Sequence, residues 1–596
     1  MAKKKSPPTK PTASAPRVTV ASPQKTVPVP TPKHGLAHAV RESVEAMAIA
    51  LVLALLFRAF VAEAFVIPTG SMALTLMGQH KDLLCPNCKY RYQVGASQET
   101  ESPLQPSTLP PEAREVVSVM CPLCRASTSV DPRTATGREY PTYGGDRILA
   151  TRFNYEFGEP RRWDVFIFKY PGLAQENYIK RLIGLPNEQV RIWHGDIYIK
   201  PEGGDAYQIE RRGPAKVREM AQIVYDNDYV VPSMTDKRWP PRWNNSPAAP
   251  AAPQAQWTTQ DDGRKFQIES AGGPIRWLRY RHYVPTLDDW ARLKQGSLPE
   301  DFHPAAQLIT DFCAYNTGIY RMRESERGPT LIGQHWVGDL MIECQLDVNS
   351  AEGQVHFDLV KGGKHFDCQL DCADGTVRLS IEGQDDFHPT ASTAVRGKGS
   401  HRVIFGNVDR QLLLWIDGTP VPFNAPTTYD PLDDEIPQAT SADPLDLAPA
   451  GIGASSASLA VSHLRLWRDL YYIAAQQGQV QISDYDRSGM LPGLDYDSLV
   501  KFFSTPAMWR PAGRPSPFEE RQEAIFSLAA DQFFPLGDNS PASKDARLWE
   551  VEPYVDRDLL VGKALLIFWP HSFDVLPGTS IPFPFFPNFA RMGFIR

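Results

Sequence analysis

Three short segments of this 596-residue chain carry residue types that can perform nucleophilic chemistry together. Residues 65–72 end in Pro-Thr-Gly-Ser-Met, which places Ser71 on a glycine-containing turn. Residues 178–188 put Lys180 among apolar side chains, and residues 536–547 contain Gly-Asp-Asn followed by further serines. A serine hydroxyl is a poor nucleophile until a neighbouring base takes its proton. None of the 13 histidines lies in these segments, so the lysine is the candidate base.

Lys180 can act as a base only while its amine is neutral. The ordinary lysine pKa of roughly 10.4 must then fall by several units, and burial among apolar groups has that effect. Its neighbours Tyr178, Ile179 and Leu182 supply such an environment. Strand alternation predicts that Arg181 faces the other side and stays solvated. The alternative is that Lys180 is an ordinary solvated strand lysine, because lysine is rarely buried.

In this order, the three segments resemble type I signal peptidase, a family of membrane-bound serine proteases that cut signal peptides from exported proteins. The resemblance implies a mainly β catalytic core with Ser71 as nucleophile and Lys180 as general base, and no cofactor for catalysis. It also implies an oxyanion hole formed by the backbone N–H of Ser71 and the Thr69 hydroxyl. A weaker match, residues 145–149 with 159–171, predicts a buried core strand at 165–168.

The resemblance also assigns supporting roles in the third segment. Ser543 is expected to hydrogen-bond the catalytic amine and orient it, while Asp545 and Arg547 form an ion pair behind it. The loop that carries these residues begins with Gly537, Asp538 and Asn539. Ala542 and Ala546 stand where the family usually has Asn and Ser, but neither position would carry a proton.

The N-terminal part of the chain predicts a membrane anchor. Residues 1–41 hold eight Lys or Arg and no acidic residue, which predicts a disordered basic tail on the cytoplasmic side. The apolar run 46–57 is too short for a span of roughly 20 residues, but 44–62 reaches 19. The resemblance places the anchor at 42–66, as a single pass through the cytoplasmic membrane with the catalytic domain outside. A cleaved signal peptide and a buried helix are the alternatives.

Two Cys-x-x-Cys pairs lie in a first insert, residues 83–126. Cys85 and Cys88 form one pair, and Cys121 and Cys124 form the other. Four thiolates are a ligand set that tetrahedral zinc prefers, and the pattern resembles a zinc ribbon, so we expect structural zinc. Disulfides are the alternative, because the outer side of the membrane is oxidising. Pairing of the other cysteines stays open: Cys313, Cys344, Cys368 and Cys372.

A second insert, residues 206–485, separates the lysine segment from the Gly-Asp-Asn segment. Its later part consists of short alternating runs such as 339–348 and 411–418, separated by turn residues, which predicts an antiparallel β-sandwich. The runs resemble laminin-G or concanavalin-like jelly rolls, which allows a glycan or protein partner. Four tryptophans are candidates for stacking on a sugar or for the core, with the core favoured: Trp257, Trp277, Trp290 and Trp336.

The predicted organisation therefore interrupts one catalytic core twice. The core comprises residues 67–82, 140–205 and 521–577, with a connector at 486–520 and a tail at 578–596. Expected partners are secreted preproteins with Ala-x-Ala-type signal peptides, the lipid bilayer and the protein-export machinery. A net charge of −7 gives no sign of nucleic-acid binding.

Two other functions fit parts of the same sequence. One is another Ser-Lys protease of the same fold, although a membrane segment beside Ser71 and the lack of a helix-turn-helix domain argue against it. The other is a membrane-anchored glycan-binding or structural protein on a degenerate peptidase scaffold, against which the intact Ser71, Lys180 and Ser543 argue.

Overall fold

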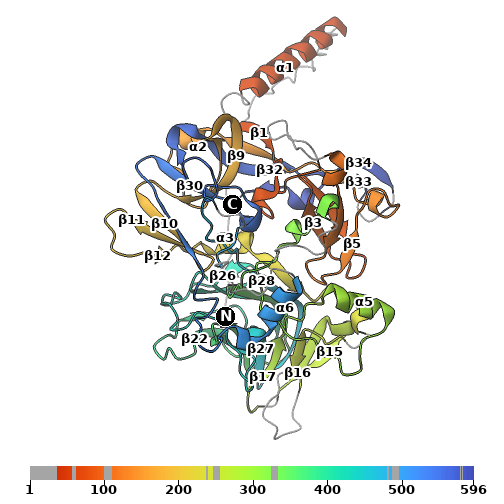
Figure 1. Ribbon diagram of the computed structural model, residues 1–596, viewed down its shortest axis with the longest axis vertical. Helices are drawn as coiled ribbons and strands as arrows, with labels where there is room; N and C mark the ends of the chain where they lie inside the picture. The colour runs from red at the N-terminus through yellow and green to blue at the C-terminus, as the bar shows by residue number, and fades with distance from the viewer. Residues whose placement is uncertain are drawn as a thin grey trace, which may run out of the picture. The chain divides into compact units, whose positions relative to one another are not determined.

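The computed structural model describes residues 36–56, 62–99, 110–235, 239–245, 256–270, 272–323, 333–478, 482–485, 496–576, 579 and 581–595. The chain forms two compact units, residues 1–59 and residues 60–596. Among the described residues, the first unit contains one helix, α1 (Leu36–Leu56), and the second contains all the strands (Figure 1). The prediction of a mainly β protein is confirmed for the second unit.

The predicted membrane anchor at 42–66 is covered only in part. No helix among the described residues combines the length and the apolar character that crossing a bilayer requires. Residues 1–35 of the predicted tail and residues 57–61 of the predicted anchor lie outside the described residues. Of the rest, residues 36–41 belong to α1 and not to a disordered tail.

Residues 62–66 form strand β1 (Ala62–Val66) and not the end of an anchor helix. β1 pairs antiparallel with β7 (Arg147–Thr151), from Ala62↔Thr151 to Val66↔Arg147. A partner about 85 residues away in sequence supplies the backbone hydrogen bonds of this segment, and a local apolar pattern cannot reveal such a partner.

The three segments that carry the candidate site residues meet in one antiparallel sheet. Its eight strands follow the order β1-β7-β32-β8-β9-β30-β31, with β35 on β32. The further strands are β8 (Val165–Tyr170), β9 (Leu173–Gly184), β30 (Gln532–Leu536), β31 (Val555–Asp556), β32 (Leu560–Trp569) and β35 (Gly593–Phe594). All four residues at 165–168 are buried, which confirms the core strand predicted there. The apolar core of this sheet extends onto a four-stranded sheet, β12 (Gln208–Ile209), β11 (Asp196–Pro201), β10 (Glu188–Trp193) and β29 (Glu523–Ser527).

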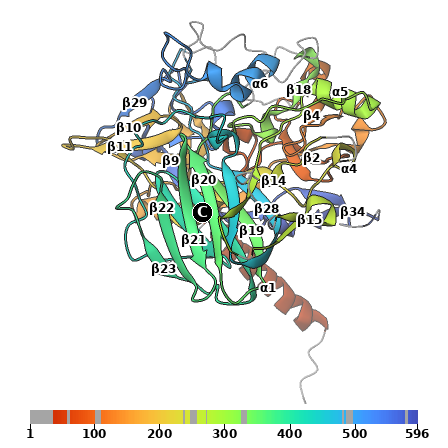
Figure 2. The same cartoon turned by 90° about the horizontal axis from the view of Figure 1, so that it is seen from below.

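Two large sheets form a β-sandwich within residues 222–468, as the alternating runs predict. One holds β13 (Gln222–Asp226), β15 (Thr258–Gln260), β16 (Lys265–Glu269), β19 (Leu340–Val348), β24 (Gly399–Val408), β25 (Gln411–Ile416), β26 (Thr419–Pro420) and β28 (Ser458–Arg468). The other holds β14 (Trp243–Asn245), β17 (Arg276–Tyr280), β20 (Gln354–Lys361), β21 (Lys364–Asp371), β22 (Thr376–Ile381), β23 (Thr390–Ser392) and β27 (Ala450–Ser455). Figure 2 shows β20 to β23 side by side. Alternate residues of both sheets fill a common apolar core.

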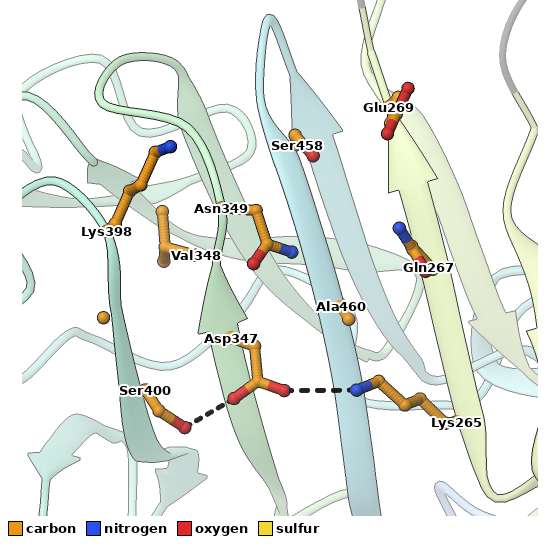
Figure 3. A pocket seen from close by; sticks show the side chains of 11 residues that line it. Lys265, Gln267, Glu269, Asp347, Val348, Asn349, Lys398, Ser400, Ser458 and Ala460 are labelled. Carbon is orange, nitrogen blue, oxygen red and sulfur yellow. Dashed lines mark hydrogen bonds and ion pairs between the residues drawn. The ribbon is translucent and has the colours of Figure 1, made fainter.

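The sandwich carries a shallow groove of about 790 Å³ on the solvent face of β16, β28, β19 and β24 (Figure 3). Its lining is polar and includes the ion pair between Lys265 and Asp347, at 3.5 Å, and contains no aromatic side chain. Three of the four candidate tryptophans are buried and belong to the protein interior: Trp257, Trp290 and Trp336. Trp277 is half-buried, with the Arg279 guanidinium 4.4 Å from its ring centre.

Two three-stranded sheets surround the cysteine pairs. One is β3 (Arg91–Gly95), β2 (His80–Leu84) and β6 (Thr142–Tyr143). The other is β18 (Ile319–Tyr320), β4 (Val116–Met120) and β5 (Ser127–Ser129). Because β18 comes from the second insert, that insert contributes to the cysteine region as well as to the sandwich.

The remaining elements connect these sheets. The other helices of the described residues are α2 (Phe153–Glu156), α3 (Pro214–Met220), α4 (Pro232–Thr235), α5 (Leu287–Gln295) and α6 (Tyr496–Ser504). α5 begins at a capping box, in which Thr286 and Asp289 satisfy each other's backbone N–H groups, and it ends at the left-handed Gly296. A two-stranded sheet, β33 (Ser572–Val575) with β34 (Pro582–Pro587), lies near the C-terminus of the chain.

Candidate active site

Ser71 lies on a short 3-10 turn, η2 (Gly70–Met72), that follows β1. Its side chain is buried, and the preceding Thr69 is exposed, with an extended backbone and no capping hydrogen bond to the turn. Gly70 is required here by close packing, because a Cβ at this position would lie 2.1 Å from a ring carbon of Tyr315. The turn therefore packs against the Tyr315 ring, and Ser71 is its middle residue.

The structure brings Lys180 to Ser71 across 109 residues of sequence. The Lys180 Nζ lies 2.8 Å from the Ser71 Oγ, and it also donates to the Ile179 carbonyl at 3.0 Å. Lys180 sits on β9 and is only 4% exposed. Burial lowers the pKa of Lys180 from its usual 10.5 to about 8, although the carboxylates of Asp545 and Asp538 act in the opposite direction. An appreciable fraction of this amine is thus neutral near neutral pH.

Arg181 is fully buried, so the prediction that it stays solvated is wrong. Its guanidinium grips the Asp538 carboxylate with two hydrogen bonds, Nε to Oδ1 at 2.7 Å and Nη2 to Oδ2 at 2.6 Å. It also donates to the Trp163 carbonyl at 2.8 Å. β9 has neighbouring strands on both edges, and its residues 180–184 are all buried, so alternation does not lead this side chain to solvent.

The third segment reaches Ser71 through Asn539. β30 pairs with β9, with Leu536 opposite Arg181, and this register delivers the following loop to Ser71. The Asn539 backbone N–H donates to the Ser71 carbonyl at 3.0 Å, and its side-chain Nδ2 donates to the Gly70 carbonyl at 2.9 Å. Asn539 therefore holds the carbonyls of Gly70 and Ser71, which belong to the two peptide groups on either side of the Ser71 Cα.

The ion pair expected behind the dyad is present. The Arg547 Nε and Nη2 each lie 2.8 Å from one oxygen of Asp545, and both side chains are buried. The same carboxylate accepts a hydrogen bond from the Gly537 N–H at 2.9 Å. The pair thus fixes the start of the Gly-Asp-Asn loop.

Ser543 departs from its expected contact. Its hydroxyl is fully buried and has no hydrogen-bond partner among the described residues, so the predicted bond to the Lys180 amine is not formed. The hydroxyl lies against the backbone of Gly537, where a Cβ would come within 2.1 Å of it. The amine is instead satisfied by the Ser71 hydroxyl and the Ile179 carbonyl.

Asn316 is a site residue that no sequence motif indicates. It comes from the second insert, and its side-chain amide pairs reciprocally with that of Asn539, at 2.7 and 2.8 Å. The only available signal, an asparagine inside a 280-residue insert, is far too common to single it out.

The four paired cysteines are buried together. The Sγ atoms of Cys85 and Cys124 are 3.5 Å apart, and those of Cys88 and Cys121 are 3.6 Å apart. All four atoms lie within 4.8 Å of one another. All eight cysteines of the chain are buried, and none forms a disulfide.

Comparisons with known proteins find partial matches to signal peptidases. Residues 116–237, which include Lys180, match the family described as signal peptidase, peptidase S26. The chain is 42% identical over 59 residues to signal peptidase I of Pseudomonas fluorescens, covering 8% of this chain and 21% of that protein. It is 34% identical over 85 residues to signal peptidase I of Leptolyngbya laminosa, covering 12% and 41%. It is 28% identical over 102 residues to a probable signal peptidase I-2 of Synechocystis sp., covering 14% and 47%.

The matched parts span less than half the length of these curated relatives. Together with the family match, they support a peptidase of the signal peptidase type.

Among solved structures, the chain is similar to the carbohydrate-binding module CBM66 from Bacillus subtilis, with a TM-score of 0.21 and 8% identity over 37% of this chain and 93% of the module. It is also similar to sheep galectin-11, with a TM-score of 0.16 and 10% identity over 23% of this chain and 92% of the galectin. Both TM-scores are too low to carry an argument about function.

Proposed function

We propose that the chain is a membrane-bound endopeptidase that removes N-terminal signal peptides from exported preproteins by a Ser-Lys dyad mechanism. The observation that carries the proposal is the 2.8 Å contact between the buried Lys180 amine and the Ser71 hydroxyl. The neutral amine takes the hydroxyl proton as Oγ attacks the scissile carbonyl, and it then protonates the leaving amine. In the second half of the reaction it activates the water that hydrolyses the acyl-enzyme.

The proposed oxyanion hole consists of the Ser71 N–H and the Thr69 hydroxyl. Asn539 holds the Gly70 carbonyl, and a trans peptide unit directs its N–H away from its carbonyl. The Ser71 N–H is therefore aimed away from Asn539, in a fixed direction where it can meet the developing oxyanion. The exposed Thr69 side chain precedes the turn and is available for the second hydrogen bond.

The proposal includes a single-pass anchor within residues 42–61 and a catalytic unit on the outer side of the cytoplasmic membrane. It is supported by the apolar run 46–57, by the basic residues before it, and by similarity to proteins named signal peptidase I. The bilayer and the protein-export machinery are the partners that follow from it.

A rival proposal, a glycan-binding protein on an inactive scaffold, has less support. The nucleophile and base are both present and in contact. The groove on the sandwich offers polar side chains but no aromatic ring on which a sugar could stack. Another Ser-Lys protease of the same fold would share the dyad, so only the choice of substrate distinguishes it from a signal peptidase.

Substrate choice gives the test of the proposed function. A model preprotein with Ala-x-Ala before the cut should be processed by the full-length protein in detergent, and the Ser71→Ala variant should leave it intact. Changing the last Ala to Leu should abolish processing, because a small pocket cannot take the larger side chain. Changing the middle residue to Leu should have little effect, since in an extended peptide that side chain faces the other way. Equal cleavage of both Leu variants, measured by gel and mass spectrometry, would contradict the proposal.

The pH dependence of cleavage should follow the Lys180 amine. Since burial lowers the pKa of Lys180 to about 8 and the base must be deprotonated, kcat/KM should rise about tenfold per pH unit below pH 8 and level off above it. Burial also lowers the pKa of Lys216, on α3, to about 8. The Lys216→Met variant is therefore the matched control, and it should keep the same profile. A flat pH profile in the unmodified protein, or a profile that changes in the Lys216→Met variant, would refute Lys180 as the base.

A further inference from the structure

The two Cys-x-x-Cys turns have the same local structure. In each, the first cysteine's carbonyl accepts a hydrogen bond from the residue four positions on, Lys89 or Arg125, at 3.0 Å. Each of those residues has a positive φ, 64° and 58°. In each turn the first cysteine's N–H also donates to the carbonyl five positions on. Two turns of identical design thus face each other and direct four sulfur atoms to one point.

The spacing of the sulfur atoms fits a tetrahedral metal. With Zn–S bonds of about 2.3 Å, the sulfurs of a four-thiolate zinc site lie about 3.8 Å apart. The contacts of 3.5 and 3.6 Å and the common limit of 4.8 Å agree with that arrangement. Disulfides would need two sulfur pairs at about 2.05 Å and would not require the two pairs to converge.

Residues of the second insert hydrogen-bond the Cys121–Cys124 turn. The Trp290 indole, on α5, donates to the Cys124 carbonyl at 2.9 Å, and the Arg242 guanidinium donates to the Leu123 carbonyl at 2.9 Å. Met120, directly before Cys121, donates its N–H to the Thr317 hydroxyl at 3.2 Å. β18 then continues the same contact by pairing with β4.

The loop that makes the Thr317 contact also touches the nucleophile turn. It consists of residues 313–317 and contains the short helix η6 (Ala314–Asn316). The Tyr315 ring packs between Gly70 and Gly95, where added Cβ atoms would lie 2.1 and 2.5 Å from it. Its neighbour Asn316 pairs with Asn539, which holds the Gly70 and Ser71 carbonyls.

We infer that Cys85, Cys88, Cys121 and Cys124 bind one zinc ion, and that this centre seats the 313–317 loop so that Asn316 can orient the Ser71 peptide. Four thiolates leave no open coordination position, so the metal is structural. Asn316 acts through Asn539 and is a positioning residue. The metal site does not depend on the proposed function. The role of Asn316 in cleavage does rest on that proposed function. The second insert is then part of the catalytic apparatus.

The metal is tested on the purified full-length protein without any substrate. Mass spectrometry of the metals should give about one zinc per chain, and Cys121→Ser should reduce the zinc content severalfold. Cobalt substitution should give the absorption spectrum of a tetrahedral thiolate site. Cys344→Ser, which changes a buried cysteine in the core of the sandwich, should keep the zinc. Absence of metal, with all four thiols resistant to alkylation until reduced, would overturn the site in favour of disulfides.

The positioning role is tested with Asn316→Ala at full zinc content. We expect kcat to fall at least tenfold with KM little changed, and hydrogen exchange of the peptide covering residues 65–77 to become faster. Asn245→Ala is the matched control, because it too replaces an asparagine of the insert that makes two side-chain hydrogen bonds, here both to Trp257 within the sandwich. It should alter neither readout.

Unchanged exchange in Asn316→Ala would overturn the positioning role, whether or not the chain cleaves preproteins. Absence of cleavage by the unmodified protein would refute the proposed function, and it would leave the zinc and exchange results to stand on their own.

Discussion

Replacing Lys180 with alanine should lower preprotein cleavage by roughly 10⁴- to 10⁶-fold in kcat, the scale found when one member of a nucleophile–base unit is removed. Among the described residues, the Lys180 amine is the side-chain group in hydrogen-bond contact with the Ser71 hydroxyl, at 2.8 Å, and the variant lacks this acceptor for the hydroxyl proton. Single-turnover cleavage of a model preprotein, at matched circular dichroism and melting temperature, measures the effect. Near-normal turnover would show that the proton goes elsewhere and that the assignment of this site is wrong.

Three further substitutions sharpen that result. Lys180→Arg should not restore activity, because a guanidinium remains protonated at every working pH. Ser71→Ala should be as inactive as Lys180→Ala, and the double variant should be no worse, since the two residues act as one unit. Thr69→Val should cost less, roughly 10²- to 10³-fold, which is typical of losing one oxyanion donor.

The sequence predicts those parts of the site that depend on short local motifs. Ser71 follows a recognisable Pro-Thr-Gly turn, and Lys180 lies in an apolar strand. Their contact is predictable only because three segments occur in a known order, not because any segment alone is distinctive. The sandwich is predictable for a similar reason, since alternation with a period of two marks each strand and its buried face.

The parts that the sequence does not predict depend on partners distant in the chain. Alternation sends Arg181 to the face opposite Lys180, but it cannot show that this face is also covered or that Asp538, 357 residues away, meets it there. β1 depends in the same way on β7. Asn316 acquires its importance only because the insert folds back to Asn539. Pairings of this kind are set by tertiary packing, which leaves no period or spacing in the sequence.

The Arg181–Asp538 pair should be among the most important single contacts for the stability of the catalytic sheet. Both side chains are buried, and Asp538 also accepts a hydrogen bond from Thr75 at 2.5 Å. Asp538→Ala should lower the free energy of unfolding by about 3–5 kcal/mol, because it leaves a buried guanidinium without its counter-charge. Urea unfolding followed by tryptophan fluorescence measures the change. The exposed pair of Arg152 with Glu63 is the control, since Glu63→Ala should cost less than about 1 kcal/mol.

A double variant separates the charge effect from packing. In Arg181→Met with Asp538→Leu no charge is left unpaired, so most of the lost stability should return. If Asp538→Ala is as mild as Glu63→Ala, the pair does not hold the sheet. The pH profile adds an independent arm, because the Asp538 carboxylate raises the pKa of Lys180 against the larger effect of burial. The double variant lacks this carboxylate, so the pKa of Lys180 should fall and kcat/KM should begin to rise at a lower pH. A defect in stability alone would not shift the profile in this way.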